Sequence, residues 1–247
     1  MDVNYQELLE RKIKKVQQSG FKIKESQLNK HLFDFQKHIV KRAIKQGRFA
    51  IFADCGLGKT LMQLDWAYQV AHKTKKRVLI LAPLAVKGQT LQESIKFGVD
   101  MSLIDINNYE QLDNIDISIY SGIVLDESSI LKNFTGKTKK LIIDKFNKTP
   151  YKLACTATPS PNDLNEIGNH SEFLNILDAQ DMRAKWFVRD EGMNNYRLKG
   201  HAKNDFYGWI SSWAIMLTNP KDLGFDGKDY VLPELKYIEK TIKTNER

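Results

Sequence analysis

The chain has 247 residues, of which 42% are hydrophobic, so it is long enough to form a packed core and disorder is not expected. Its formal net charge of +8 attracts polyanions, but the same charge can serve only to keep a lysine-rich chain soluble. Charge alone therefore does not decide whether the chain binds nucleic acid. Its two cysteines form no C-x-x-C pair, which argues against a disulfide framework or a zinc site. No apolar stretch has the length of a membrane span, so we expect a cytoplasmic protein without a membrane partner.

Two amphipathic helices are predicted before the first strand. Apolar residues recur at helical spacing over residues 5–18. They recur again over residues 33–45, where Phe35, Ile39 and Ile44 share one face. The second helix is expected to lead directly into the first strand.

Short apolar runs alternate with longer amphipathic runs through the middle of the chain. The apolar runs are residues 49–53, 78–82, 123–126 and 153–156. The amphipathic runs between them are residues 60–72, 87–97 and 138–146. Unbroken apolar strands that alternate with helices predict an α/β fold, with a mostly parallel sheet covered by helices on both faces. Ligands of such folds bind at the carboxyl ends of the strands.

The segment ADCGLGKT, residues 53–60, joins the first predicted strand to a helix and has the context of a phosphate-binding loop. Its glycines allow backbone N–H groups to point at an anion, and the helix N-terminus adds a favourable dipole. We expect Lys59 to bridge the β- and γ-phosphates of ATP and the Thr60 hydroxyl to bind Mg²⁺. The residues expected to surround the nucleotide here are Cys55, Gly56, Leu57, Gly58, Lys59 and Thr60. Ala53 departs from the generic G-x-x-x-x-G-K-[ST] pattern.

Two adjacent carboxylates end the third apolar run, in the sequence GIVLDESS. We expect Asp126 to hold Mg²⁺ through bound water and Glu127 to orient and deprotonate the attacking water. A solitary Asp-Glu pair is usually a solvated surface feature. Its position at a strand end, downstream of a phosphate loop, is what favours a catalytic role.

Hydroxyls end the fourth apolar run, in the sequence KLACTATPSPND. Thr156 and Thr158 are expected to hydrogen-bond the carboxylates and to couple the rest of the molecule to the γ-phosphate, although such turns are also ordinary loop chemistry. Cys55 admits two interpretations. An oxidised thiol there would block ATP, but a small buried thiol is the favoured interpretation.

The last third of the chain has a different pattern. Residues 171–219 are rich in aromatics and are predicted to be mostly helical, above all residues 206–217. We expect these aromatics to form core rather than a base-stacking platform. The organisation we predict is an N-terminal helical extension over residues 1–30, an ATP-binding domain over residues 31–232, and a linker over residues 233–247 into a second domain.

These motifs resemble those of superfamily 2 helicases, particularly the Swi/Snf-like branch and its members encoded by bacteriophages and prophages. ADCGLGKT resembles motif I, including its Ala53, and DESS resembles the DEAD/DEAH box of motif II, with Ser129 in place of the usual His or Asp. TAT resembles motif III. LILAPLAV, residues 79–86, is similar to motif Ia, and INNYEQL, residues 106–112, is similar to motif Ib.

The resemblance implies a RecA-like lobe and an ATP-dependent helicase or translocase, with DNA as the favoured polymer, in the host bacterial cytoplasm if the gene is phage-borne. It implies that Gln36 of the Q motif reads the adenine edge. It also implies backbone contacts by Lys87, Asn108 and Lys132, although each is more often a solvated residue. A second RecA-like lobe of the same polypeptide is expected to supply the arginine finger, so the isolated lobe should be weakly active.

Two other classes stay open. The chain could be a P-loop kinase that acts on a small molecule. Its positive charge would then have no functional role, and its activity would not change when nucleic acid is added. A nucleic-acid-binding scaffold with a vestigial ATP site would fail to gain stability from nucleotide. The intact set of Lys59, Thr60, Asp126 and Glu127 argues against such decay.

Overall fold

The structure is a computed structural model that describes residues 18–132, 136–189, 196–230 and 238. The helix predicted over residues 5–18 and the linker predicted over residues 233–247 lie almost entirely outside these residues. Among the described residues, no helix is long and apolar enough to cross a membrane.

A six-stranded parallel sheet forms the centre of the molecule, with the strand order β3-β2-β4-β5-β1-β8. Its strands are β1 (Arg48–Ala53), β2 (Arg77–Ala82), β3 (Ile104–Asn108), β4 (Tyr120–Asp126), β5 (Tyr151–Thr156) and β8 (Ala214–Leu217). The four predicted strands are present, and the central ones are buried along nearly their whole length. This burial on both faces explains their unbroken apolar sequences.

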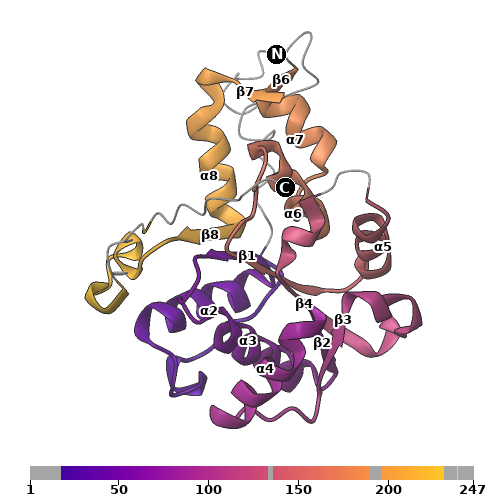
Figure 1. Cartoon of the computed structure of the whole chain (residues 1–247), viewed down its shortest axis with the longest axis vertical. Helices are drawn as coiled ribbons and strands as arrows, with labels where there is room; N and C mark the ends of the chain where they lie inside the picture. The colour runs from indigo at the N-terminus through magenta and orange to yellow at the C-terminus, as the bar shows by residue number, and fades with distance from the viewer. Residues whose placement is uncertain (1–17, 133–135, 190–195, 231–237, 239–247) are drawn as a thin grey trace, which may run out of the picture.

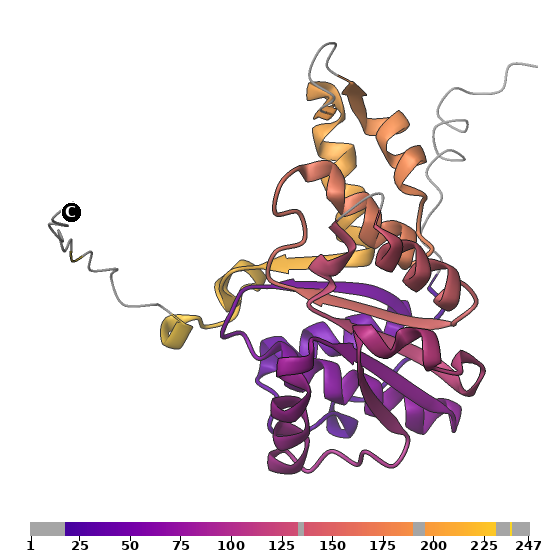
Figure 2. The same ribbon diagram turned by 45° about the vertical axis from the view of Figure 1, so that its right-hand side comes forward.

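Helices cover both faces of the sheet, as Figures 1 and 2 show. The helices on one face are α2 (Asp34–Gln46), α3 (Lys59–Thr74) and α4 (Leu84–Lys96). Those on the other are α5 (Lys137–Phe146), α6 (Ile167–Phe173), α7 (Ala179–Trp186) and α8 (Lys203–Trp213). Two apolar cores result, one on each side of the sheet. The predicted α/β class with a mostly parallel sheet is confirmed.

The helix predicted over residues 206–217 is wrong in its last turn. Helix α8 ends at Trp213, where Ala214 takes extended dihedral angles of φ −136° and ψ 162°. Residues Ala214–Leu217 then add a sixth strand beside β1. Pairing with β1 satisfies the backbone of this apolar segment better than solvent would, and it overrides the helical spacing.

Two further elements were not predicted. Strand β3 was missed because its sequence, IDINN, alternates apolar and polar residues instead of forming an apolar run. Residues 171–219 were expected to be mostly helical, but they also contain a short antiparallel hairpin of β6 (Phe187–Arg189) and β7 (Tyr196–Leu198). The aromatics of this region are mainly core, as expected. Trp186, Phe206 and Trp213 are buried.

Candidate nucleotide-binding site

The predicted phosphate loop lies between the end of β1 and the start of α3, at the carboxyl edge of the sheet. Gly56 and Gly58 have φ values of 81° and 72°, in the left-handed region that favours glycine. A Cβ at Gly58 would lie 2.4 Å from Nε2 of Gln36, whereas a Cβ at Gly56 would meet nothing within 4 Å. The dihedral angles therefore favour glycine at both positions, and a Cβ at Gly58 would in addition displace the end of the Gln36 side chain.

Lys59 and Thr60 form the first turn of α3, where unpaired backbone N–H groups and the helix dipole favour an anion. The Nζ of Lys59 donates hydrogen bonds to the carbonyls of Ala53 (2.9 Å) and Asp54 (3.2 Å). The ammonium therefore lies over the loop. Both side chains are half-buried. A loop with this charge, a neighbouring hydroxyl and a helix N-terminus is suited to bind phosphates.

Asp126 is the last residue of β4 and is almost fully buried. Its Oδ1 accepts a hydrogen bond of 2.7 Å from Nε2 of Gln63, which lies one turn after Thr60 on the same helix. Burial raises the pKa of the Asp126 carboxyl, while the Gln63 hydrogen bond and the charge of Lys59 act to lower that pKa. Gln63 thus ties the loop helix to the carboxylate. Sequence reasoning did not find Gln63, although its spacing of three from Thr60 places both on one helix face.

Glu127 follows directly and has a φ of 53°, which is uncommon for a residue with a side chain. Its Oε2 accepts a hydrogen bond of 3.2 Å from the Thr156 hydroxyl at the end of β5. The backbone N–H of Thr158 donates in turn to Thr156 Oγ1 at 3.1 Å, while the Thr158 side chain is exposed. The contact expected between Thr156 and the carboxylates is therefore present. The coupling role of the two threonines stays a prediction.

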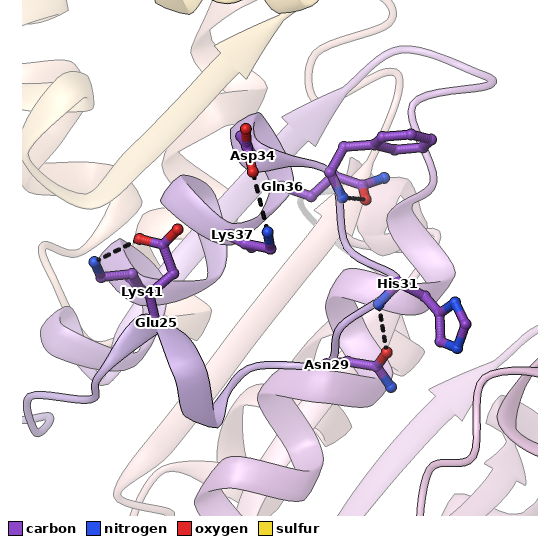
Figure 3. A network of polar contacts seen from close by, with 8 residues as sticks. Glu25, Asn29, His31, Asp34, Gln36, Lys37 and Lys41 are labelled. Atoms are coloured by element: carbon purple, nitrogen blue, oxygen red, sulfur yellow. Dashed lines mark hydrogen bonds and ion pairs between the residues drawn. The ribbon is translucent and has the colours of Figure 1, made fainter.

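Gln36 packs against the phosphate loop from the first turn of α2. Its Oε1 accepts from the backbone N–H of Phe33 at 2.9 Å, and its Nε2 donates to the carbonyl of Leu57 at 3.0 Å. Figure 3 shows Gln36 beside the ion pair of Asp34 with Lys37. Gln36 is buried, and its hydrogen bond to Leu57 places it at the loop. Its reading of an adenine edge stays a prediction.

The chain matches the family model described as "Type III restriction enzyme, res subunit" over residues 29–143, which include the phosphate loop and the carboxylate pair. It also resembles the SWI2/SNF2 ATPase core of Sulfolobus solfataricus, determined in complex with dsDNA, with a TM-score of 0.64 and 21% identity over 79% of this chain. The chain therefore has a RecA-like fold, which it shares with that core.

Two more solved structures share the fold of this lobe. The UvsW helicase from Bacteriophage T4 has a TM-score of 0.51, with 14% identity, and the match covers 72% of this chain and 67% of that one. The Hef helicase domain of Pyrococcus furiosus has a TM-score of 0.52, with 18% identity, over 60% of this chain and 38% of that one. The present chain spans 46% of the Sulfolobus core. No curated protein sequence matches it.

The three residues suggested for nucleic-acid contact each lie at or after the carboxyl end of a strand of this RecA-like lobe. Lys87 lies half-buried in the first turn of α4, which follows β2. Asn108 ends β3, and its Oδ1 caps the turn η2 (Tyr109–Asn114) by accepting from Gln111 N at 3.0 Å. Lys132 is exposed after β4. The Asn108 carboxamide oxygen thus accepts a hydrogen bond within the turn, and contact of any of the three residues with nucleic acid stays a prediction.

A buried histidine that sequence reasoning missed lies beside the carboxylate pair of the lobe. Nε2 of His170, on α6, is 3.1 Å from the Ser128 hydroxyl, and the ring stands edge-on to Phe52. Burial lowers the pKa of His170 to about 4, so the ring is neutral at physiological pH. His170 thus supports the segment after Glu127 from the opposite helical layer. No sequence motif signals this contact.

Cys55 is exposed in the loop, so its interpretation as a small buried thiol is wrong, whereas Cys155 is buried. The cause is the position of Cys55 in the loop after β1, where residues 54–56 are exposed instead of packed in the core. An exposed thiol in this loop is open to modification.

Alkylation with iodoacetamide is therefore expected to block nucleotide binding through Cys55, because the added group would occupy the phosphate position. Binding of a fluorescent ATP analogue before and after treatment measures the effect. Cys55→Ser should bind the analogue equally well with or without the reagent. Equal loss of binding in wild-type protein and Cys55→Ser would contradict the assignment.

Proposed function

We propose that this RecA-like lobe, over residues 31–232, is the ATP-binding part of a nucleic-acid-dependent ATPase, a helicase or translocase that acts on DNA. One observation carries the proposal. Asp126 and Glu127 leave β4 at the edge where the phosphate loop lies, and each is held by a neighbouring element. Gln63 of the loop helix bonds the first and Thr156 of β5 bonds the second.

We assign the roles as follows. Lys59 and the N-terminus of α3 bind the phosphates, with Cys55, Gly56, Leu57 and Gly58 supplying backbone N–H groups. Glu127 accepts a proton from the attacking water and orients that water. Thr156 and Thr158 report the state of the γ-phosphate to the remainder of the lobe.

The polar groups at the site fit Mg²⁺, which prefers oxygen ligands and keeps several of its waters. Thr60 supplies a hydroxyl and Asp126 a carboxylate, and the Oε1 of Gln63 is a buried acceptor that makes no hydrogen bond to the described residues. Bound with ATP, the ion would neutralise charge on the phosphate oxygens. We therefore propose Thr60 and Asp126 as the residues that hold it.

DNA is proposed as the polymer because the chain carries a net charge of +8 and because the similar Sulfolobus core was determined with dsDNA. The strand-end residues Lys87, Asn108 and Lys132 form the proposed track. A second RecA-like lobe of the same polypeptide would complete the ATP site with an arginine finger. A phage origin, and with it a bacterial cytoplasm, is proposed from the motif resemblance.

The deciding experiment is a set of parallel ATPase assays of the full-length protein with duplex DNA, single-stranded DNA, RNA and no polymer. Duplex DNA is expected to raise turnover by at least about tenfold, which corresponds to about 1.4 kcal/mol of barrier. Turnover that ignores all three polymers but requires a small phosphate acceptor would instead indicate a kinase.

A further inference from the structure

A buried tyrosine connects the end of β3 to the carboxylate pair. The Tyr109 hydroxyl donates a hydrogen bond of 2.6 Å to the backbone carbonyl of Asp126. Tyr109 is buried, and burial together with the charges of Asp126 and Glu127 raises the pKa of its hydroxyl well above the ordinary value. The hydroxyl therefore remains a hydrogen-bond donor over the whole physiological pH range.

The acceptor of this hydrogen bond belongs to the peptide group that joins Asp126 to Glu127. Glu127 has a φ of 53°, a conformation that costs about 1 kcal/mol for a residue with a Cβ and persists only where the surroundings impose it. Three hydrogen bonds surround that residue. Tyr109 holds the carbonyl before it, Ile130 N donates to its own carbonyl at 3.2 Å, and Thr156 holds its carboxylate.

The hydrogen bond crosses the sheet. Strand β2 lies between β3 and β4, and its last pair with β4 joins Leu81 to Leu125. Asp126 lies one residue further, so the Tyr109 hydroxyl supplies a donor where the pairing with β2 has ended. Tyr109 also lines a pocket of about 540 Å³ between η2 and α5. Tyr109 therefore contacts both this pocket and the backbone of the carboxylate pair.

We propose that Tyr109 is a positioning residue, whose hydroxyl fixes the Asp126–Glu127 peptide and thereby aims the Glu127 carboxylate at the attacking water. Movement of the β3–η2 segment, where Asn108 is a proposed contact to nucleic acid, is transmitted to Glu127 through this single hydrogen bond. This inference rests on the proposed ATPase function. It adds a physical link between the polymer track and the hydrolytic group.

The test compares Tyr109→Phe with wild-type full-length protein, at saturating duplex DNA. Phenylalanine keeps the buried ring and removes the hydroxyl alone. The expected result is a kcat about tenfold lower, on the scale of one lost hydrogen bond, with the KM for ATP unchanged within about twofold. The DNA concentration for half-maximal stimulation should also stay the same, because Tyr109 is proposed to position Glu127 and not to bind DNA.

Tyr120→Phe is the matched control, because the Tyr120 hydroxyl bonds Asp105 at 2.9 Å at the opposite end of β4. It should keep the wild-type kcat. Equal kcat in Tyr109→Phe and wild type, or a change confined to KM, would overturn the inference. So would a fall in kcat that disappears when turnover is measured well below the melting temperatures of both proteins, which would make the role structural, since loss of the buried hydrogen bond by itself lowers stability. A wild-type protein without any turnover would instead refute the proposed function, and the inference with it.

Discussion

Lys59→Ala is expected to lower the DNA-stimulated ATPase activity of the full-length protein by at least about 100-fold, on the scale of losing a preorganised electrostatic contact. The Lys59 ammonium lies over the loop, 2.9 Å from the Ala53 carbonyl, where the dipole of α3 already favours negative charge. Alanine removes the charge that would meet the phosphates. It leaves the glycines and the backbone N–H groups of the loop in place.

Turnover at saturating DNA and binding of a fluorescent ATP analogue measure this effect. Lys76→Ala provides a control because Lys76 is exposed beyond the far end of α3 and the substitution removes the same charge. The control should retain wild-type turnover. Undiminished hydrolysis in Lys59→Ala would mean that the loop does not bind the transferred phosphate, and the proposed function would fail.

Glu127→Gln is expected to separate binding from hydrolysis. General-base catalysis contributes about 10²–10⁴-fold in rate, and turnover should fall by that amount because an amide does not accept the proton of water. Glutamine retains the size of the side chain and an oxygen that accepts from Thr156, now 3.2 Å from the carboxylate. The loop and Asp126 are unchanged. Nucleotide affinity should therefore remain close to that of the wild type.

Thermal unfolding with and without ATP tests the binding half of this prediction, because a ligand that binds only the folded state raises the melting temperature. Glu93→Gln is a suitable control because the Glu93 carboxylate accepts a hydrogen bond of 3.3 Å from Gln89 on the same helix, α4, and glutamine keeps an oxygen that can accept it. A Glu127→Gln protein that hydrolyses ATP at the wild-type rate would assign the base to another group.

The phosphate loop and the carboxylate pair were predictable because their signals are local. ADCGLGKT holds its glycines, its lysine and its hydroxyl within eight consecutive positions, and Asp126 and Glu127 directly follow an apolar run. The four predicted strands are buried on both faces, which makes them unbroken apolar segments. In these cases a short stretch of sequence contains all the residues that determine the local structure.

The contacts that hold the pair in place were not predictable, because each depends on tertiary structure. Gln63 and Tyr109 reach Asp126 from a helix and from a turn, and His170 reaches Ser128 from the opposite layer. None of these residue types is unusual for its position. The prediction of a helix over residues 214–217 was wrong for the same reason, since the segment AIML becomes strand β8 only because β1 is available beside it.

The late position of β8 in the sequence has a consequence for biosynthesis. β1 is made early, yet its outer neighbour is made only when residues Ala214–Leu217 leave the ribosome, on the order of ten seconds later. Until then β1 presents an open strand edge, a known route to aggregation. The carbonyl of Leu217 also accepts from the N–H of Asp54, so the start of the phosphate loop gains this partner at the same moment. A nascent chain shorter than this length exposes the edge of the six-residue strand β1, whereas the finished sheet exposes on this side only the edge of the four-residue strand β8.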